Sequence, residues 1–152
     1  MEISNMLSNK LIFLNENFDS TSELFDFVGT KTKELDLSYD DYAVNLKKRE
    51  ENFPTALEFN DIGVAIPHAD SKSLKKEFIS LITLDKPLIF RAMENPDKEV
   101  KVKIVFVLGL LKANDQLETL QAIVKLLQKE NALEHLNHAN NVKEVVNIVN
   151  EL

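Results

Sequence analysis

The sequence predicts one layered α/β domain in which helices cover both faces of a β-sheet. Two observations support this expectation. Strand-like apolar runs alternate along the chain with segments whose apolar residues recur at helical spacing. The 152 residues fit one domain, residues 1–152, and three glycines and four prolines leave few places for long loops.

The first half of the chain predicts a strand, two helices and a second strand. Residues 10–14 form a short apolar run, and Ser20–Glu23 resembles a capping box that opens a helix. Apolar residues of the segment 39–46 fall at i, i+3, i+4 and i+7, so a second helix is expected there, ending before Pro54. Residues 63–66 are a strand-like run that a proline terminates.

The second half predicts two longer strands and then helices. Residues 78–84 are apolar and β-branched, with an expected stop at residues 85–87, Asp-Lys-Pro. Residues 100–108 begin with alternating lysines and end continuously apolar, which is typical of a strand that finishes buried on both faces. Three helices are expected to close the chain, starting near Asp115, Glu130 and Asn141.

Composition excludes several classes of protein. Hydrophobic residues make up 44% and charged residues 28%, as in an ordinary globular protein, and the longest apolar run, 104–108, is far too short for a membrane span. No secretory signal is visible, and the absence of cysteine excludes disulfides and thiolate sites, which fits a cytoplasmic location. A net charge of −7 without a basic cluster argues against nucleic-acid binding.

Few residues can act as nucleophiles or metal ligands. The chain lacks a P-loop, a G-x-G-x-x-G turn, a G-x-S-x-G elbow and an H-E-x-x-H helix. Three histidines remain: His68, His135 and His138. The last two lie three apart in a polar stretch without a third ligand nearby, so two solvent-facing histidines are favoured over a metal site.

His68 directly follows a strand-like run and Pro67, where α/β sheets tend to place their sites. Position alone leaves two alternatives open, a loop histidine or a site residue. Upstream, Arg49 offers a planar fork of donors suited to phosphate oxygens, although a surface charge or an ion pair with a neighbouring glutamate is the alternative. Thr55 offers a hydroxyl donor or a turn, and the lysines of residues 72–76 offer positive charge or a solvated face.

The combination of R-E and F-P-T at residues 49–55 with G-V-A-I-P-H at residues 63–68 resembles the enzyme IIA domains of the bacterial phosphoenolpyruvate:sugar phosphotransferase system. The resemblance is to the fructose–mannitol superfamily of these domains and covers nearly the whole chain. It implies a mixed β-sheet flanked by helices, as in mannitol-type IIA domains. It also implies a phosphocarrier enzyme that needs no cofactor and no metal.

Site residues and partners follow from the same resemblance. The phosphorylated histidine of the family falls on His68, with the phosphoryl group on Nε2, and its phosphate-stabilising arginine falls on Arg49. Thr55 and nearby backbone amides would add donors. The donor would be phosphohistidine of HPr and the acceptor a cysteine of a IIB protein or domain, with membrane IIC reached only indirectly.

Two positions depart from the family pattern. Many members carry a second active-site histidine in an H-L-x-x-L motif, and here Gln116 occupies its place. Glutamine can donate a hydrogen bond but cannot carry a positive charge, so Arg49 becomes the main electrostatic support. Ala56 stands where a glycine is common. The glutamine and the Phe-Pro-Thr segment are similar to galactitol-type IIA proteins, which favours galactitol or a related alcohol as the sugar transported.

Two other functions stay open on the sequence. The first is a regulatory IIA-like phosphoacceptor that serves no transporter, because nitrogen-related IIA proteins resemble this chain too. The second is a non-catalytic metal-binding module built on His135 and His138. Transfer to a IIB cysteine would separate the first from the transport role, and zinc binding would support the second.

Overall fold

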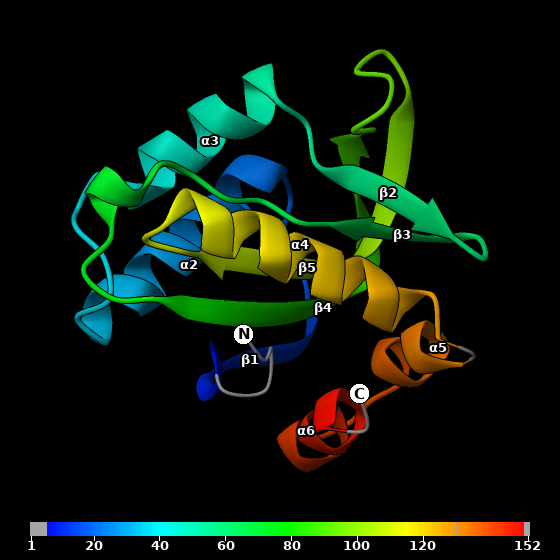
Figure 1. The fold of residues 1–152 in the computed structure, drawn as a ribbon. Helices are drawn as coiled ribbons and strands as arrows, with labels where there is room; N and C mark the ends of the chain where they lie inside the picture. The colour runs from blue at the N-terminus through cyan, green and yellow to red at the C-terminus, as the bar shows by residue number, and fades with distance from the viewer. Residues whose placement is uncertain (1–5, 130, 151–152) are drawn as a thin grey trace.

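The computed structural model describes residues 6–129 and 131–150. A five-stranded mixed sheet with the strand order β1-β4-β5-β3-β2 forms its centre (Figure 1). Its strands are β1 (Leu7–Glu16), β2 (Ala56–Phe59), β3 (Ile62–Ala65), β4 (Phe78–Arg91) and β5 (Glu99–Gly109). The β1–β4 and β3–β5 pairs are parallel, whereas β4–β5 and β2–β3 are antiparallel. The expectation of an α/β fold with a mixed sheet is confirmed.

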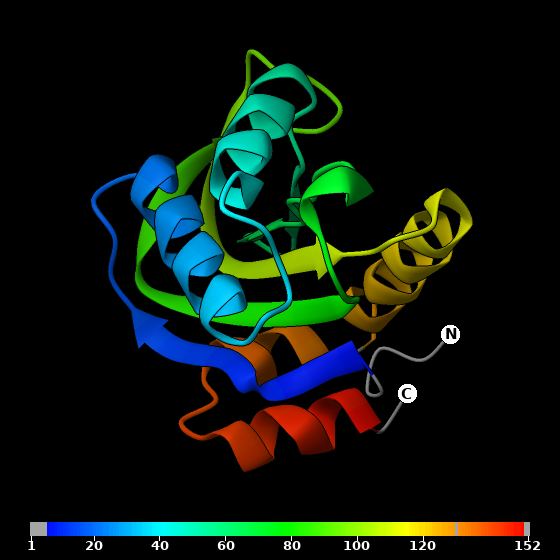
Figure 2. The ribbon, with the colours of Figure 1, turned by 90° about the vertical axis from the view of Figure 1, so that its left-hand side faces the viewer.

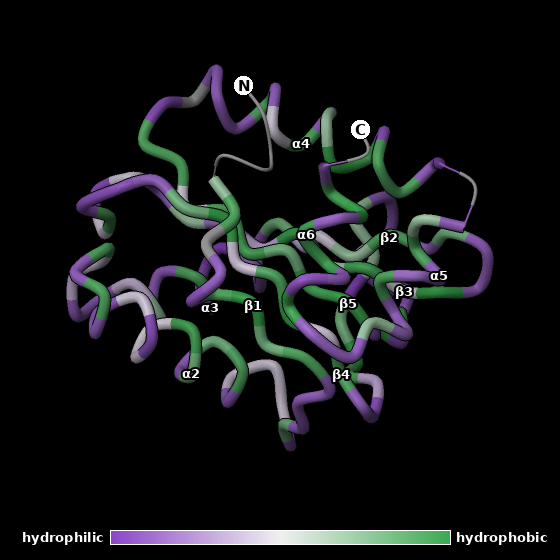
Figure 3. Tube along the Cα trace, turned by 90° about the horizontal axis from the view of Figure 1, so that it is seen from below, coloured by the Kyte–Doolittle hydropathy of each residue, from purple (hydrophilic) through white to green (hydrophobic). Residues whose placement is uncertain are grey.

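Helices lie on both faces of this sheet (Figure 2). They are α2 (Thr21–Glu34), α3 (Tyr42–Asn52), α4 (Ala113–Leu127), α5 (Ala132–Asn137) and α6 (Val142–Asn150), with a single 3₁₀ turn, η1 (Ser71–Ser73). One apolar core packs α2 and α3 against the sheet, and a second packs α4, α5 and α6 against the opposite face. Figure 3 shows hydrophobic residues gathered along the strands and hydrophilic residues in the outer turns. Within the described residues, no helix is both long and apolar enough to cross a membrane.

Two of the three expected helix caps are confirmed. Ser20 Oγ accepts the Glu23 amide at 3.1 Å, while the Glu23 carboxylate accepts the Asp19 amide at 3.1 Å, which opens α2. Asn141 caps α6 in the same way, since its Oδ1 accepts the Glu144 amide at 2.9 Å. The third helix, α4, starts two residues before Asp115, close to the expected position, but the expected cap at Asp115 was wrong: the helix begins directly after extended Lys112, and Asp115 lies in its first turn, where a carboxylate favours the helix dipole.

Strand β4 does not end at residues 85–87, as the sequence indicated, but continues to Arg91. Its pairing with β5 shifts register between Thr83 and Leu88, and the exposed Pro87 lies in this irregular stretch. Proline has no N–H to donate to a neighbouring strand, and an irregular stretch does not require one. Its other neighbour, β1, pairs only as far as Leu84. Pairing with a partner strand therefore overrides the local stop signal.

The sequence analysis missed strand β2. It pairs antiparallel with β3 through the two-residue connection Asn60-Asp61, and both residues have positive φ, 50° and 68°. Asparagine and aspartate tolerate this left-handed conformation better than other non-glycine residues, and tight hairpin turns require it. The Asn-Asp pair was the available signal for a hairpin that ends close to His68.

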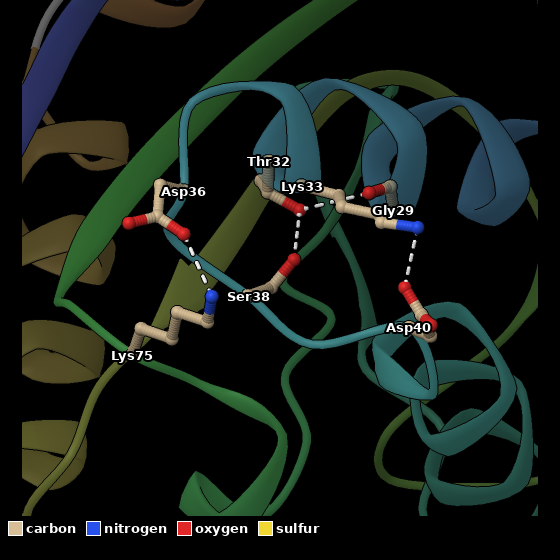
Figure 4. A network of polar contacts seen from close by, with 7 residues as sticks. All are labelled: Gly29, Thr32, Lys33, Asp36, Ser38, Asp40 and Lys75. Atoms are coloured by element: carbon tan, nitrogen blue, oxygen red, sulfur yellow. Dashed lines mark hydrogen bonds and ion pairs between the residues drawn. The ribbon is translucent and has the colours of Figure 1, made fainter.

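Polar contacts fix the connection between α2 and α3 (Figure 4). The hydroxyls of Thr32 and Ser38 lie 2.7 Å apart in the interior, and Lys75 pairs with Asp36 at 2.7 Å across the surface. On α3 itself, Asn45 donates to Ser73 of η1. These contacts tie α3 to the segment that follows His68.

Candidate functional site

Strand β3 delivers His68 to the end of the sheet. Residues 64–66 are fully buried, and Pro67 follows them. The Pro67 carbonyl accepts the Leu108 amide of central strand β5 at 2.9 Å, and His68 forms an isolated parallel bridge with Leu108. The segment is thus held against β5 up to the residue where the side chain leaves the sheet. His68 itself is only partly buried.

The imidazole of His68 has a defined tautomer. Its Nδ1 lies 3.1 Å from the Ile66 carbonyl oxygen, which can only accept, so Nδ1 carries the proton and Nε2 bears the free lone pair. Burial of the ring lowers the pKa of His68 below its ordinary value of 6.5, and the charge of Arg49 lowers it further. The Ile66 hydrogen bond and Asp70 act in the opposite sense. The ring is therefore neutral near pH 7, with a lone pair on Nε2.

Arg49 lies in the last turn of α3. Its guanidinium stacks on the ring of Phe53, 4.4 Å from the centroid, and its buried Nε has no hydrogen-bond partner. Among the residues that the structure describes, no ion pair within 4.0 Å involves Arg49, so the alternative of a pair with a neighbouring glutamate is not realised. A cation close enough to affect His68, with an unused buried donor, is suited to an anion bound at that ring.

Thr55 is buried and bonded differently from the sequence expectation. Its hydroxyl proton goes to Glu50 Oε1 at 2.8 Å, and its amide donates to Glu50 Oε2 at 2.9 Å. The same hydroxyl oxygen accepts the Ile66 amide at 3.1 Å. In this conformation the Thr55 hydroxyl has no proton left for a phosphoryl oxygen, and its contact with the site runs through Ile66.

Glu50 is the residue of this region that sequence reasoning missed. Burial raises the pKa of its carboxyl to about 7, against the two hydrogen bonds from Thr55, which lower it. A glutamate beside an arginine on a polar helix end gives no sign in the sequence that it turns inward. The available signal was the family resemblance, whose R-E pair includes Glu50 and whose F-P-T segment includes Thr55, but it assigned Glu50 no role.

A small cavity of about 210 Å³ adjoins His68 on its α4 side, and its lining residues are His68, Leu108, Gln116, Leu117 and Leu120. Gln116, in the first turn of α4, is the one lining residue besides His68 with a polar side chain. Its Nε2 lies 3.5 Å from the Leu110 carbonyl, at the outer limit of a hydrogen bond. The structure therefore brings Gln116 to His68, as expected, with a weakly held amide.

The other charged candidates lie elsewhere. Lys75 binds Asp36 and, with Lys72, lines a separate hollow along the α2–α3 connection. His135 and His138 are exposed on and just after α5. Over residues 6–129 and 131–150, no group of three or more histidines or carboxylates is placed to hold a metal ion.

Known proteins share both the sequence pattern and the fold. The transcriptional regulator ManR of Bacillus subtilis (strain 168) is 32% identical over 124 residues, which are 80% of this chain but only 17% of the regulator. The chain thus spans about a sixth of that relative. The galactitol-specific EIIA component of Escherichia coli (strain K12) is 25% identical over 130 residues, 86% of each protein.

Solved structures agree. The mannitol-specific cryptic enzyme IIA CmtB of Escherichia coli superposes with a TM-score of 0.79 over 100% of both chains at 23% identity. Nitrogen regulatory protein IIA-Ntr of Neisseria meningitidis gives 0.74 at 27% identity, covering 97% of this chain and 98% of its own. Escherichia coli IIA mannitol, solved in complex with phosphorylated IIB mannitol, gives 0.75 at 19% identity, covering 96% and 98%.

The family model described as "Phosphoenolpyruvate-dependent sugar phosphotransferase system, EIIA 2" matches residues 5–152. That range includes the β3 end with His68, the α3 end with Arg49 and the start of α4 with Gln116. The chain therefore belongs to the EIIA 2 family of this phosphotransferase system, and it is a phosphotransferase component.

Proposed function

We propose that His68 carries a phosphoryl group on Nε2, received from phosphohistidine of HPr and passed to a cysteine of a IIB partner. One observation carries the proposal: a neutral imidazole, with its Nδ1 proton hydrogen-bonded to a backbone carbonyl, lies in the field of Arg49, which makes no ion pair within 4.0 Å among the described residues. The imidazole supplies the lone pair, and the arginine supplies charge for the phosphoryl oxygens.

Two displacements at phosphorus make up the cycle. The Nε2 lone pair forms a bond to phosphorus while the N–P bond of phospho-HPr breaks and its electron pair returns to the donor imidazole. Throughout the cycle, His68 keeps its Nδ1 proton, which stays hydrogen-bonded to the Ile66 carbonyl. A IIB thiolate then attacks phosphorus, an S–P bond forms, and the lone pair returns to Nε2. Such transfers depend on positioning and on charge at the equatorial oxygens, which Arg49 stabilises. The cycle runs in the cytoplasm.

Phosphorylation from purified components tests this role. Incubation with labelled phosphoenolpyruvate, enzyme I and HPr should give one acid-labile, base-stable phosphoryl group per chain, and His68→Gln should abolish it. A double variant, His135→Gln with His138→Gln, is the matched control, because both histidines are exposed and neither lines the cavity at His68; it should label like the parent chain. Label retained in His68→Gln would contradict the proposal.

The acceptor is proposed to be a IIB component for galactitol or a related sugar alcohol. The supporting observations are Gln116 beside His68 and the 25% identity to the galactitol-specific EIIA component over 86% of each protein. Phosphoryl transfer from the labelled chain to a panel of IIB proteins is the test. Fastest transfer to a galactitol-type IIB would support the assignment, and faster transfer to another IIB would contradict it.

A regulatory phosphoacceptor is the second candidate function. Its support is the 32% identity to a segment of the transcriptional regulator ManR and the 27% identity to nitrogen regulatory protein IIA-Ntr. The same panel separates the two functions. A chain that is labelled on His68 by HPr but transfers to no IIB cysteine would favour the regulatory role.

A further inference from the structure

A continuous series of hydrogen bonds runs from Glu50 on α3 to the ring of His68. Both carboxylate oxygens of Glu50 accept from Thr55, at 2.9 and 2.8 Å. The Thr55 hydroxyl oxygen accepts the Ile66 amide at 3.1 Å, and the Ile66 carbonyl holds His68 Nδ1 at 3.1 Å. Thr55 is only 2% exposed and Ile66 is fully buried, so the bond between them is shielded from water, while the bonds at the two ends of the series are partly buried.

Each bond in this series restricts the next. The carboxylate holds Thr55 by two donors at once, which fixes both its backbone and its side-chain rotamer. The hydroxyl then fixes the amide of Ile66, one residue beyond the last residue of β3, while the Pro67 carbonyl is fixed by Leu108. Ile66 is thereby held at the residue whose carbonyl selects the tautomer of His68.

We propose that Glu50, acting through Thr55, is a positioning residue that sets the orientation and tautomer of His68, an inference that rests on the proposed phosphoryl transfer. Glu50 touches neither the ring nor the site of the incoming phosphoryl group. Its effect is to keep the Ile66 carbonyl aimed at Nδ1, so that Nε2 presents a free lone pair for attack. Two adjacent residues at the end of α3 thus have different roles: Arg49 supplies positive charge, and Glu50 fixes the orientation of His68.

The chain offers a matched control for the threonine. Thr83 on β4 is 1% exposed, and its hydroxyl oxygen accepts the Asn15 amide at 2.8 Å. Thr83→Val therefore removes an amide-to-hydroxyl bond like the one that Ile66 makes to Thr55, in contact with β1 instead of with the Ile66–His68 segment. Thr55→Ser keeps the hydroxyl and tests rescue.

The test combines a spectroscopic and a kinetic measurement. Thr55→Val should convert the single Nδ1–H tautomer of His68, followed by imidazole ¹⁵N NMR, into a mixture. It should also lower kcat for phosphoryl uptake from phospho-HPr about 10-fold with little change in KM, the size expected for one lost orienting hydrogen bond. Thr55→Ser should recover most of this loss, and Thr83→Val should lower Tm without moving either readout.

A pair of glutamate variants covers the case in which Thr55→Val does not fold. Glu50→Ala should show the same tautomer mixture and the same loss in kcat, and Glu51→Ala, at the exposed neighbouring position, should show neither. A wild-type tautomer and rate in Glu50→Ala or in folded Thr55→Val would overturn the inference. If the parent chain takes up no phosphoryl group, the proposed function fails, but the NMR measurement still decides whether Glu50 orients His68.

Discussion

The two sides of His68 present different kinds of side chains. On the α3 side lie Arg49, which has no ion-pair partner among the described residues, and Glu50, whose carboxylate holds buried Thr55 through two hydrogen bonds. On the α4 side lie three leucines and Gln116, whose side-chain amide lies 3.5 Å from the Leu110 carbonyl. The α3 side is charged and fixed by hydrogen bonds, whereas the α4 side is apolar and loosely bonded.

For the proposed role of His68, this difference indicates how one histidine would hold a phosphoryl group without a partner histidine. A second imidazole at position 116 would place positive charge on both sides of the phosphorus. With glutamine there, the charge comes from α3 alone, and α4 contributes an apolar wall and one amide. The electrostatic and the orienting contributions are then both concentrated in the last turn of α3 and the residues just beyond it.

The largest expected effect is the loss of the guanidinium on the α3 side. Arg49→Gln should slow phosphoryl uptake from phospho-HPr about 100-fold, because one preorganised donor to developing charge is typically worth this much. The uptake rate of Arg49→Lys should lie between those of the parent and Arg49→Gln, since an ammonium restores charge without the planar fork. Single-turnover transfer measures both.

The other arginine of the chain is the natural control. Arg91 is exposed and pairs with Glu99 at 3.8 Å, so Arg91→Gln should transfer phosphoryl at the parent rate. Equal rates for Arg49→Gln and Arg91→Gln would remove the electrostatic asymmetry between the two sides of His68.

A smaller effect is expected on the pH dependence of stability. Burial raises the pKa of Glu50 to about 7, so between its ordinary value near 4.5 and pH 7 the folded chain binds more protons than the unfolded chain. Glu50 therefore lowers the free energy of unfolding as pH rises through this window. The charged residues that line a hollow on the protein surface together with Glu50 are Lys47, Glu51 and Arg91.

Glu50→Gln removes this titration. The free energy of unfolding of each chain is measured by urea titration at pH 5 and at pH 8. From pH 5 to pH 8, the parent should lose on the order of 2 kcal/mol of stability relative to Glu50→Gln. Glu51→Gln, at an exposed site, should track the parent at both pH values. A constant difference between Glu50→Gln and the parent would show that the carboxyl titrates normally and that the α3 side is more open to water than the contacts indicate.

Sequence patterns predicted the parts of this molecule that depend on local chemistry. The strand before His68 ends at a proline, the Ser20 and Asn141 caps use neighbouring residues, and Arg49 lies on an amphipathic helix, so each is visible within a few positions. The strand passing through Pro87 was not visible, because pairing with β5 decides it.

The contacts between Glu50 and Thr55 could not be predicted from the sequence either. Glu50 and Thr55 are five residues apart across Pro54, and nothing in their order shows that one carboxylate accepts both donors of one threonine. Strand β2 contains only four residues, and its hairpin turn uses Asn60-Asp61 instead of a glycine. Burial of polar groups follows from the core that gathers residues of α3, β2 and β3 into one cluster, which no local pattern encodes.

The smallest expected effect lies on the α4 side. Gln116→Leu should slow phosphoryl uptake only about 3-fold, because it removes one neutral donor whose present contact with the Leu110 carbonyl is long. Gln121→Leu, at an exposed position of the same helix, controls for the added apolar surface. A loss in Gln116→Leu as large as that in Arg49→Gln would mean that the amide turns onto the phosphoryl oxygens and supports them as strongly as the guanidinium does. The same single-turnover assay then decides whether His68 is supported mainly from α3 or equally from both helices.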